Sequence, residues 1–221
     1  MITRVLVVDD DPLVRSALGL MLGGQPDIEV AGEACDGLEG VRLAGELHPD
    51  VVLMDIRMPR LDGLGATREL HARPDPPRVI VLTTFDADEH VVEALAAGAD
   101  GFLLKDTPPP QIIEAIRKVV DDEPMLSPSA TRTLIRRLRT DSDEADEAGR
   151  ERAEQARDLL ATLTEREREV AGAVGRGLSN AEIAGELYLS VPTVKAHVSR
   201  LFDKLAVTNR VQIAITVHDA S

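Results

Sequence analysis

The first 120 residues alternate between short apolar runs and longer segments with the periodicity of amphipathic helices. The runs that predict strands are Arg4–Val8, Ile28–Ala34, Val51–Met54, Val79–Thr83 and Gly101–Leu104. The segments between them predict helices over residues 13–23, 37–47, 64–72, 88–97 and 108–121. Five successive strand–helix units predict a doubly wound α/β fold, in which helices cover both faces of a five-stranded parallel sheet.

The last 61 residues have a different pattern, which is helical throughout and has no strand-like alternation. Thr164 and Glu167 have capping-box spacing and predict a helix that continues to about Val174. Ser179 and Ser190 are suitable N-caps for the next two helices. The predicted helices after the first cover Ala181–Leu187, Val191–Leu205 and Arg210–His218. A tight connection between the first two of these predicts a helix-turn-helix in a separate all-α domain.

The segment between these regions has the composition of a linker. Ser127 and Pro128 predict the start of a helix that carries Leu134, Ile135 and Leu138. The stretch Asp141–Gly149 is acidic and lacks large apolar residues, which predicts a flexible chain. The pattern does not decide whether Arg150–Leu160 continues into the next helix. We therefore expect an N-terminal domain over residues 1–121, a linker over 122–160 and a C-terminal domain over 161–221.

Composition and charge limit the classes of function. Apolar residues make up 43% of the chain, and no run approaches the roughly 18 apolar residues of a membrane span. No signal peptide is visible, and the lone Cys35 excludes an internal disulfide, so we expect a cytoplasmic protein without a membrane partner. The net charge of −14 belongs to residues 1–160, whereas residues 161–221 carry seven acids and seven bases. The C-terminal segment can therefore present a local basic face to phosphates.

Polar residues follow the predicted strands at positions that a parallel sheet brings together. Asp9, Asp10 and Asp11 follow the first strand, Asp55 follows the third, Thr83 ends the fourth and Lys105 follows the fifth. The carboxyl ends of parallel strands form one edge, where α/β proteins place their ligand sites. Clustered carboxylates repel each other unless a cation lies among them, and hard oxygen ligands suit Mg²⁺.

Each of these residues also has a simpler interpretation. Asp11 precedes Pro12 and is best explained as a helix N-cap. Asp9 or Asp10 alone fits a turn, Lys105 alone fits a solvated surface and Thr83 alone fits an ordinary strand residue. Their joint placement at strand ends, together with Asp55, favours a common site over coincidence.

Residues 1–121 resemble the flavodoxin-like receiver domain of two-component response regulators. The matching segments are Val5–Asp10, Asp55–Gly63, Val81–Thr84 and Gly101–Asp106. The resemblance implies that Asp55 accepts a phosphoryl group from a sensor histidine kinase. It also implies that Mg²⁺ is bound by Asp10 directly, by Asp9 mainly through water, by Asp55 and by the backbone carbonyl of Arg57. Thr83 and Lys105 would then hold the phosphoryl oxygens.

The resemblance also implies a switch, with Phe102 at the aromatic position three residues before Lys105. A phosphoryl group on Asp55 would attract Thr83, and the space that Thr83 leaves would admit Phe102. Because Phe102 lacks the hydroxyl of a Tyr, packing alone would have to drive this inward rotation.

Residues 161–221 resemble the NarL/FixJ (LuxR-type) DNA-binding domain, through the segments Leu163–Val170, Gly177–Ala184 and Val191–Leu205. The resemblance implies that helix Val191–Leu205 enters the major groove of double-stranded DNA. The candidate base-facing residues are Lys195, Ala196 and Ser199, and the candidate phosphate contacts are Asn180, Thr193, Arg200, Lys204 and Arg210. We expect a homodimer on paired half-sites when the protein is phosphorylated, with Val211–Val217 in the dimer contact.

Three alternatives compete with a phosphorylation-controlled transcription regulator. A haloacid-dehalogenase-type phosphatase would use Asp9 as nucleophile and Asp11 as acid–base, but it would leave Asp55 unexplained. The N-terminal domain could instead be a constitutive dimerisation module, and the C-terminal helices could be a hairpin that binds a protein partner. The regulator interpretation expects no turnover enzyme, only self-phosphorylation and self-dephosphorylation of Asp55.

Overall fold

The structure is a computed structural model that describes residues 2–84, 88–121, 123, 125–126 and 147–220. These residues form two compact units, one from Thr3 to Leu126 and one from Glu147 onward. The helix predicted to start at Ser127, and residues 141–146 of the acidic stretch, lie outside the described residues.

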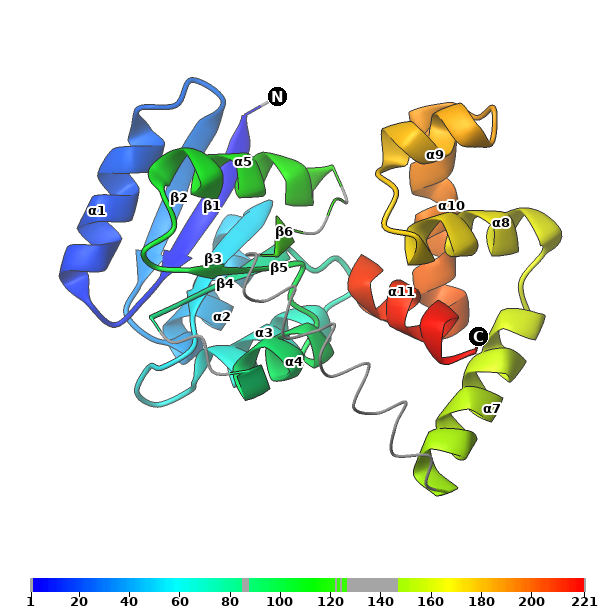
Figure 1. The fold of residues 1–221 in the computed structure, drawn as a ribbon. Helices are drawn as coiled ribbons and strands as arrows, with labels where there is room; N and C mark the ends of the chain where they lie inside the picture. Colours follow the sequence, from blue (N-terminus) through cyan, green and yellow to red (C-terminus); the bar gives the residue numbers. More distant parts are fainter. Residues whose placement is uncertain (1, 85–87, 122, 124, 127–146, 221) are drawn as a thin grey trace. The chain divides into compact units, whose positions relative to one another are not determined.

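The N-terminal unit contains the predicted parallel sheet (Figure 1). The strands are β1 (Thr3–Val8), β2 (Ile28–Ala34), β3 (Val51–Asp55), β4 (Arg78–Thr83), β5 (Gly101–Leu104) and β6 (Met125–Leu126). They lie in the order β2-β1-β3-β4-β5-β6, and every neighbouring pair is parallel. The five expected strands are thus confirmed, with ends that differ from the predicted ones by at most one residue.

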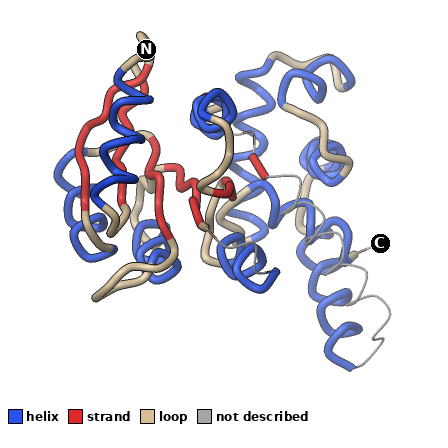
Figure 2. The backbone as a smooth tube through the Cα atoms, turned by 60° about the vertical axis from the view of Figure 1, so that its left-hand side comes forward, coloured by secondary structure: helices blue, strands red, loops and turns tan. Residues whose placement is uncertain are grey.

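Helices cover both faces of this sheet, as the doubly wound pattern predicts (Figures 1 and 2). They are α1 (Pro12–Gly23), α2 (Gly37–Leu47), α3 (Gly63–His71), α4 (Asp88–Ala96) and α5 (Pro109–Val120). α1 and α5 pack on one face, where a core cluster joins their apolar side chains to alternate strand residues such as Val7, Leu53 and Leu103. The intervening strand residues, among them Met54 and Phe102, are also fully buried, and they belong to the opposite face because successive strand side chains alternate. Helices α2, α3 and α4 cover that face (Figure 1). Burial on both faces explains why β3, β4 and most of β1 and β5 read as continuous apolar runs, whereas the edge strand β2 is only partly buried and carries two glutamates.

The sixth strand was not predicted. β6 consists of two residues, and it pairs with β5 so that Met125 lies opposite Gly101 and Leu126 opposite Phe102. A segment this short has no measurable hydrophobic period, so its pairing follows from the path of the chain after α5.

The C-terminal unit is all-helical, as predicted, and consists of α7 (Glu147–Ala161), α8 (Glu165–Gly175), α9 (Asn180–Glu186), α10 (Val191–Leu205) and α11 (Arg210–Asp219). Capping boxes start α8 at Thr164 and α9 at Ser179, and Ser190 caps α10. Val194, Val198, Leu201 and Leu205 form the buried face of α10 and pack against residues of α8, α9 and α11. The structure therefore has the predicted helix-turn-helix in α9 and α10.

The segment Arg150–Leu160, which the sequence left undecided, belongs to a helix of its own. α7 ends at Ala161, and the chain turns at Thr162 and Leu163 before α8 begins. α7 packs against α11 and α10, and Leu159 and Leu160 contact the core cluster of the C-terminal unit. Among the described residues, no helix combines the length and the apolar character that a membrane crossing requires.

A close backbone approach shapes the loop between β3 and α3, next to Asp55. Gly63 is buried, and its N–H donates to the carbonyl of Ile56 at 2.9 Å. A Cβ atom at Gly63 would collide with the backbone carbonyl of Asp55. The loop can therefore close against the end of β3 only with glycine at this position.

We predict that Gly63→Ala lowers the free energy of unfolding by about 1–3 kcal/mol, because the backbone must move to admit the methyl group. Urea unfolding of the full chain measures this change. Gly23→Ala is the matched control, because a Cβ at Gly23 meets no atom within 4 Å. Equal stability of the two variants would contradict the prediction.

Candidate functional site

Three carboxylates meet at the carboxyl edge of the N-terminal sheet. Asp9 follows β1 and Asp55 ends β3, and these strands are neighbours in the sheet. Asp9 and Asp55 are buried, whereas Asp10 is exposed. One carboxylate oxygen from each of the three lies within 4.8 Å of the others, a spacing that fits a metal ion. The structure thus brings together the three side chains that the sequence predicted as metal ligands.

Lys105 supplies the positive charge at this edge. Its ammonium nitrogen lies 2.6 Å from Asp9 Oδ2 and 3.1 Å from Asp55 Oδ2. Burial opposes the charged form of Lys105, but the hydrogen bond to Asp9 and the charge of Asp55 outweigh it and raise the pKa of the lysine. Lys105 is therefore a fixed cation at the pocket, as predicted, rather than a solvated surface lysine.

Asp55 has the environment of a buried carboxyl group. Burial raises its pKa, and the charge of Lys105 opposes that rise without cancelling it. One of its oxygens also accepts a hydrogen bond from the backbone N–H of Ile56 at 2.9 Å, which fixes the orientation of the carboxylate. Asp55 thus presents its other oxygen beside Asp9 and Lys105.

Asp11 caps α1, as the simpler interpretation predicted. Its side chain accepts a hydrogen bond from the N–H of Leu13 at 2.8 Å. Asp9 in turn accepts from the N–H of Asp11 at 3.0 Å, so the turn after β1 holds the Asp9 carboxylate in place. This arrangement gives Asp11 a structural role and separates it from the pocket.

Thr83 ends β4, and Phe102 lies on the neighbouring strand β5, three residues before Lys105. Thr83 is buried at the end of β4, and its carbonyl accepts the N–H of Lys105 at 2.8 Å. Phe102 is fully buried on β5, opposite Val81 of β4. The structure thus shows Phe102 in the inward position, and the rotation predicted from the sequence stays a prediction. The Mg²⁺ role of the Arg57 carbonyl also stays a prediction.

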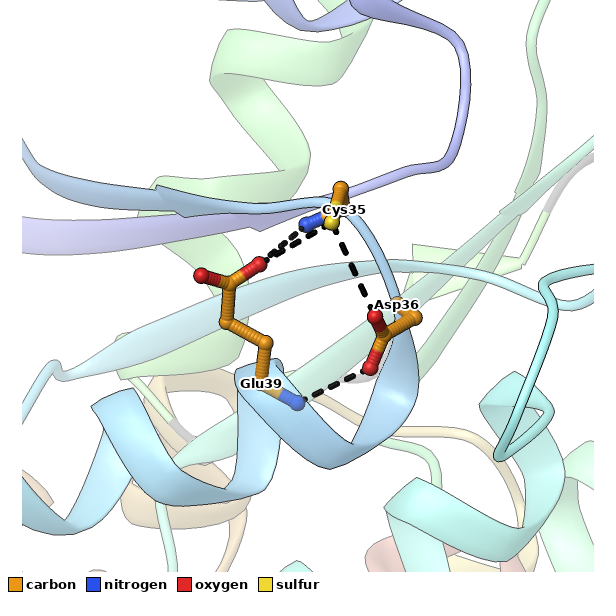
Figure 3. A group of neighbouring side chains, drawn as sticks. All are labelled: Cys35, Asp36 and Glu39. Atoms are coloured by element: carbon orange, nitrogen blue, oxygen red, sulfur yellow. Dashed lines mark hydrogen bonds between the residues drawn. The ribbon is translucent and has the colours of Figure 1, made fainter.

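A second group with metal-ligand spacing comprises Cys35, Asp36 and Glu39 at the start of α2 (Figure 3). Hydrogen bonds within the fold already occupy these side chains. Asp36 accepts from the N–H of Glu39 as the N-cap of α2 and pairs with Arg60, and Glu39 accepts from the N–H of Cys35 at 2.9 Å. The group is explained as a helix cap, because its oxygens are engaged and an arginine competes for Asp36.

The exposed face of α10 carries most of the predicted base-reading residues. Ala196, Ser199 and Arg200 are exposed and Lys195 is half-buried, on the side away from the core. Thr193 is half-buried, and its hydroxyl lies 2.7 Å from that of Ser190. The geometry is compatible with contacts from this face to DNA, and each individual contact stays a prediction.

Three of the residues predicted to contact phosphates make side-chain contacts within the C-terminal unit, and two of these three are buried. Arg210 and Asn180 are buried, and the Arg210 guanidinium donates to Asn180 Oδ1 at 2.7 Å and to the carbonyl of Leu178. This pair joins the start of α11 to the start of α9. Because both side chains are buried, they would have to leave this contact to reach phosphates, and the predicted phosphate contacts of Arg210 and Asn180 stay predictions. Lys204 donates to Glu167 Oε2 at 2.7 Å, because this buried carboxylate requires a cation.

Glu167 is a structural residue whose full role the sequence did not reveal. The sequence shows its capping-box spacing with Thr164. It does not show the ion pair with Lys204, because the two residues are 37 positions apart in the chain. The hydrogen bond from Lys204 and those from Thr164 lower the pKa of Glu167 to about 2. Glu167 therefore fastens the start of α8 to the end of α10.

Both units match known protein families. The family described as "Response regulator receiver domain" matches residues 5–117, and the family described as "Bacterial regulatory proteins, luxR family" matches residues 161–217. The transcriptional regulatory protein LiaR of Bacillus subtilis is 40% identical over 215 residues, which are 97% of this chain and 96% of LiaR. The nitrate/nitrite response regulator protein NarL of Escherichia coli K12 is 36% identical over 97% of this chain and 94% of NarL. The crystal structure of the response regulator ChrA of a heme-sensing two-component system is similar at 33% identity and a TM-score of 0.52, over 98% of this chain and 96% of ChrA.

We predict that Glu167→Gln destabilises the C-terminal unit by about 1 kcal/mol at pH 7, because the amide cannot replace a charged partner of Lys204. The folded-state pKa of Glu167 is lowered from 4.5 to about 2, so its contribution is complete above pH 4.5 and is lost as the pH falls towards 2. The difference in unfolding free energy between wild type and variant, measured in urea at several pH values, should shrink over that range. Glu165→Gln, at an exposed position of the same turn, is the control. A difference that does not change with pH would contradict the prediction.

Proposed function

Because the chain belongs to the two-component response regulators that join a receiver domain to a LuxR-type DNA-binding domain, we propose that phosphorylation of Asp55 controls its binding to DNA. A sensor histidine kinase donates the phosphoryl group. The phosphorylated protein dimerises and binds a promoter operator with its C-terminal helix-turn-helix. The observation that carries this proposal is the convergence of Asp9, Asp10, Asp55 and Lys105 at one edge of the sheet.

The geometry of Asp55 supports its role as the acceptor. A carboxylate oxygen of Asp55 attacks the phosphorus of the phosphohistidine, a P–O bond forms, the P–N bond breaks, and the imidazole leaves with the bonding electrons and takes up a proton. The bond from Ile56 N–H to Asp55 Oδ1 leaves Oδ2, on the side of Lys105, to act as nucleophile. Hydrolysis later returns Asp55 to a carboxylate, so the protein turns over its own modification and no separate substrate.

The carboxylates of Asp9, Asp10 and Asp55 fit a divalent cation that binds hard oxygen ligands, and Mg²⁺ is the ion we propose. Mg²⁺ supplies charge neutralisation for the phosphoryl oxygens when it is bound. Lys105 reaches both Asp9 and Asp55, so it can follow the negative charge as the charge moves onto the phosphoryl group. Thr83, on the neighbouring strand end, supplies a hydroxyl for the remaining oxygen.

The switch that we propose uses the elements around Thr83. Movement of Thr83 towards the phosphoryl group changes the contacts of β4 with β5, where Phe102 already fills the interior. The change in packing, rather than the phosphate charge itself, shifts the equilibrium between two conformations of the receiver. The conformation that the phosphoryl group stabilises forms the homodimer. The cytoplasm, which holds the chromosome, is the compartment in which we infer that the protein acts.

We predict that Asp55→Asn abolishes labelling by a small phosphodonor such as acetyl phosphate, because the amide is not a nucleophile for phosphorus. Mass spectrometry of the intact chain measures the label, and wild type should gain one phosphoryl group. Asp62→Asn is the control, because Asp62 is an exposed N-cap of α3 outside the pocket. Labelling of Asp55→Asn at the wild-type rate would place the acceptor elsewhere.

The same variant tests the link to dimerisation. Beryllofluoride imitates a phosphoryl group on an aspartate, and it should increase the sedimentation coefficient of wild type but not of Asp55→Asn. An unchanged mass of wild type together with tighter operator binding would refute dimerisation as the switch.

We predict that Lys195→Ala weakens operator binding by about 1–3 kcal/mol, because the side chain lies on the exposed side of the recognition helix. Binding is measured at a fixed salt concentration, since protein–DNA affinity depends steeply on salt. Arg157→Ala removes an exposed cation from α7 and serves as the control. Equal losses in the two variants would show that overall charge, and not contact by α10, determines affinity.

A further inference from the structure

The side chain of Arg15 reaches from α1 to the turn that carries two carboxylates of the acidic pocket. Arg15 lies near the start of α1, and its side chain is 18% exposed. One guanidinium nitrogen, Nη1, donates to the backbone carbonyl of Asp9 at 2.6 Å. The Nε atom lies 3.6 Å from a carboxylate oxygen of Glu33 on β2. The side chain thus connects the second strand to the turn after the first.

The carbonyl that accepts this bond belongs to the peptide between Asp9 and Asp10. A peptide unit is planar, so a bond that fixes its oxygen also fixes the direction in which the chain enters Asp10. The N–H of Asp9 is held separately, because it donates to the carbonyl of Ala34 at 3.1 Å. The Asp9 carboxylate accepts from the N–H of Asp11 and pairs with Lys105. The Asp10 side chain is exposed, so its position depends on the backbone that carries it.

We propose that Arg15 is a positioning residue for the divalent cation of the acidic pocket, and that it acts by holding the peptide between Asp9 and Asp10. The inference rests on the proposed function, in which Asp9, Asp10 and Asp55 bind Mg²⁺. With the Arg15 bond in place, one carboxylate oxygen of each of the three lies within 4.8 Å of the others. Without it, the Asp9 carbonyl turns towards water to replace the lost donor, and the Asp10 carboxylate moves away from the other two.

The charge of Arg15 and its geometry have opposite effects on a bound cation. A positive charge near the pocket repels a divalent cation, so charge alone makes Arg15 unfavourable for metal binding. The planar guanidinium, however, carries several N–H donors in fixed directions. One of them holds the Asp9 carbonyl while Nε faces Glu33, which keeps the side chain from turning into solvent. The sign of the change in metal affinity therefore distinguishes the two effects.

Replacement of Arg15 by methionine tests the proposal, because methionine has a similar length but neither charge nor donor. Mn²⁺ binds oxygen ligands as Mg²⁺ does, and electron paramagnetic resonance of the free ion measures its binding to the full chain. We expect Arg15→Met to raise the Mn²⁺ dissociation constant about tenfold, the lower end of the range for outer partners of metal ligands. Loss of charge alone would lower that constant or leave it unchanged. A misfolded fraction would instead give fewer sites with the wild-type constant.

Three further variants complete the test. Arg15→Gln is polar and too short to reach the Asp9 carbonyl, so it should show the same increase and replaces Arg15→Met if that variant does not fold. Arg15→Lys keeps a donor on a long side chain and should bind Mn²⁺ more tightly than Arg15→Met. Equal losses in these two variants would contradict the proposal. Arg42→Met removes a cation from α2 that pairs with Glu46, and it should not weaken Mn²⁺ binding.

Labelling of Asp55 by acetyl phosphate gives a second measurement. In Arg15→Met, the Mg²⁺ concentration for half-maximal labelling should rise by the same factor as the Mn²⁺ dissociation constant. The labelling rate should return towards the wild-type value at saturating Mg²⁺, because the acceptor itself is unchanged. A lower rate at every Mg²⁺ concentration, with an unchanged half-maximal concentration, would show a general defect of the fold and would overturn the inference.

The outcomes separate this inference from the proposed function. If wild type is labelled on Asp55 and Arg15→Met binds Mn²⁺ as tightly as wild type or more tightly, the inference is wrong and the proposed function stands. Wild type that binds no Mn²⁺ overturns the inference together with the proposed Mg²⁺ site. Wild type that accepts no label refutes the proposed function, and the inference with it.

Discussion

The N-terminal unit depends on a balance of charge at the carboxyl edge of its sheet. Two like charges about 4 Å apart repel each other by roughly 4 kcal/mol at the effective dielectric of a protein surface. Asp9 and Asp55 are both buried there, and the ammonium of Lys105 lies within hydrogen-bonding distance of each. The same three groups make the edge suitable for an anionic phosphoryl group and its counterion, because negative charge added at Asp55 alters both ion pairs of the Lys105 ammonium. The charge balance that the fold must maintain at this edge is thus also the source of its proposed sensitivity to phosphorylation.

Backbone hydrogen bonds connect the charged groups at this edge to the last strands of the sheet. Lys105 is joined through its backbone to Thr83 on β4, and β5, which precedes it, carries Phe102 into the interior. β5 is in turn paired with β6, the last described element of the N-terminal unit. We therefore propose that a rearrangement at Asp55 reaches β6 through the pairings β3–β4, β4–β5 and β5–β6. Phe102 is fully buried in this structure, so a switch that starts from this state requires a shift of packed strands.

Most of the fold and of the acidic pocket could be predicted because the signals are local or follow from parallel topology. Buried strands read as apolar runs, and the carboxyl ends of such strands must share an edge, so Asp55 and Lys105 could be placed together despite their distance in sequence. The pairs Arg210–Asn180 and Lys204–Glu167 could not be predicted, since each joins residues at least 30 positions apart through tertiary packing. A cation on a helix looks like a surface residue until its buried partner is known. β6 was not predicted because a segment of two residues is too short to show a hydrophobic periodicity.

These internal pairs alter the electrostatics of DNA binding. Lys204 pairs with Glu167 within the fold, and Arg210 is buried at the start of α11. On α10, Arg200 is therefore the exposed cation that we expect to meet phosphates, and the half-buried Lys195 is the one that we expect to face bases. Affinity from phosphate contacts grows with the number of phosphates neutralised, so one copy of such a helix binds DNA weakly at physiological salt. Two linked copies multiply their binding through effective concentration, which requires no new contact. In the function that we propose, a weak single module is what allows dimerisation, and hence the state of Asp55, to decide whether the operator is occupied.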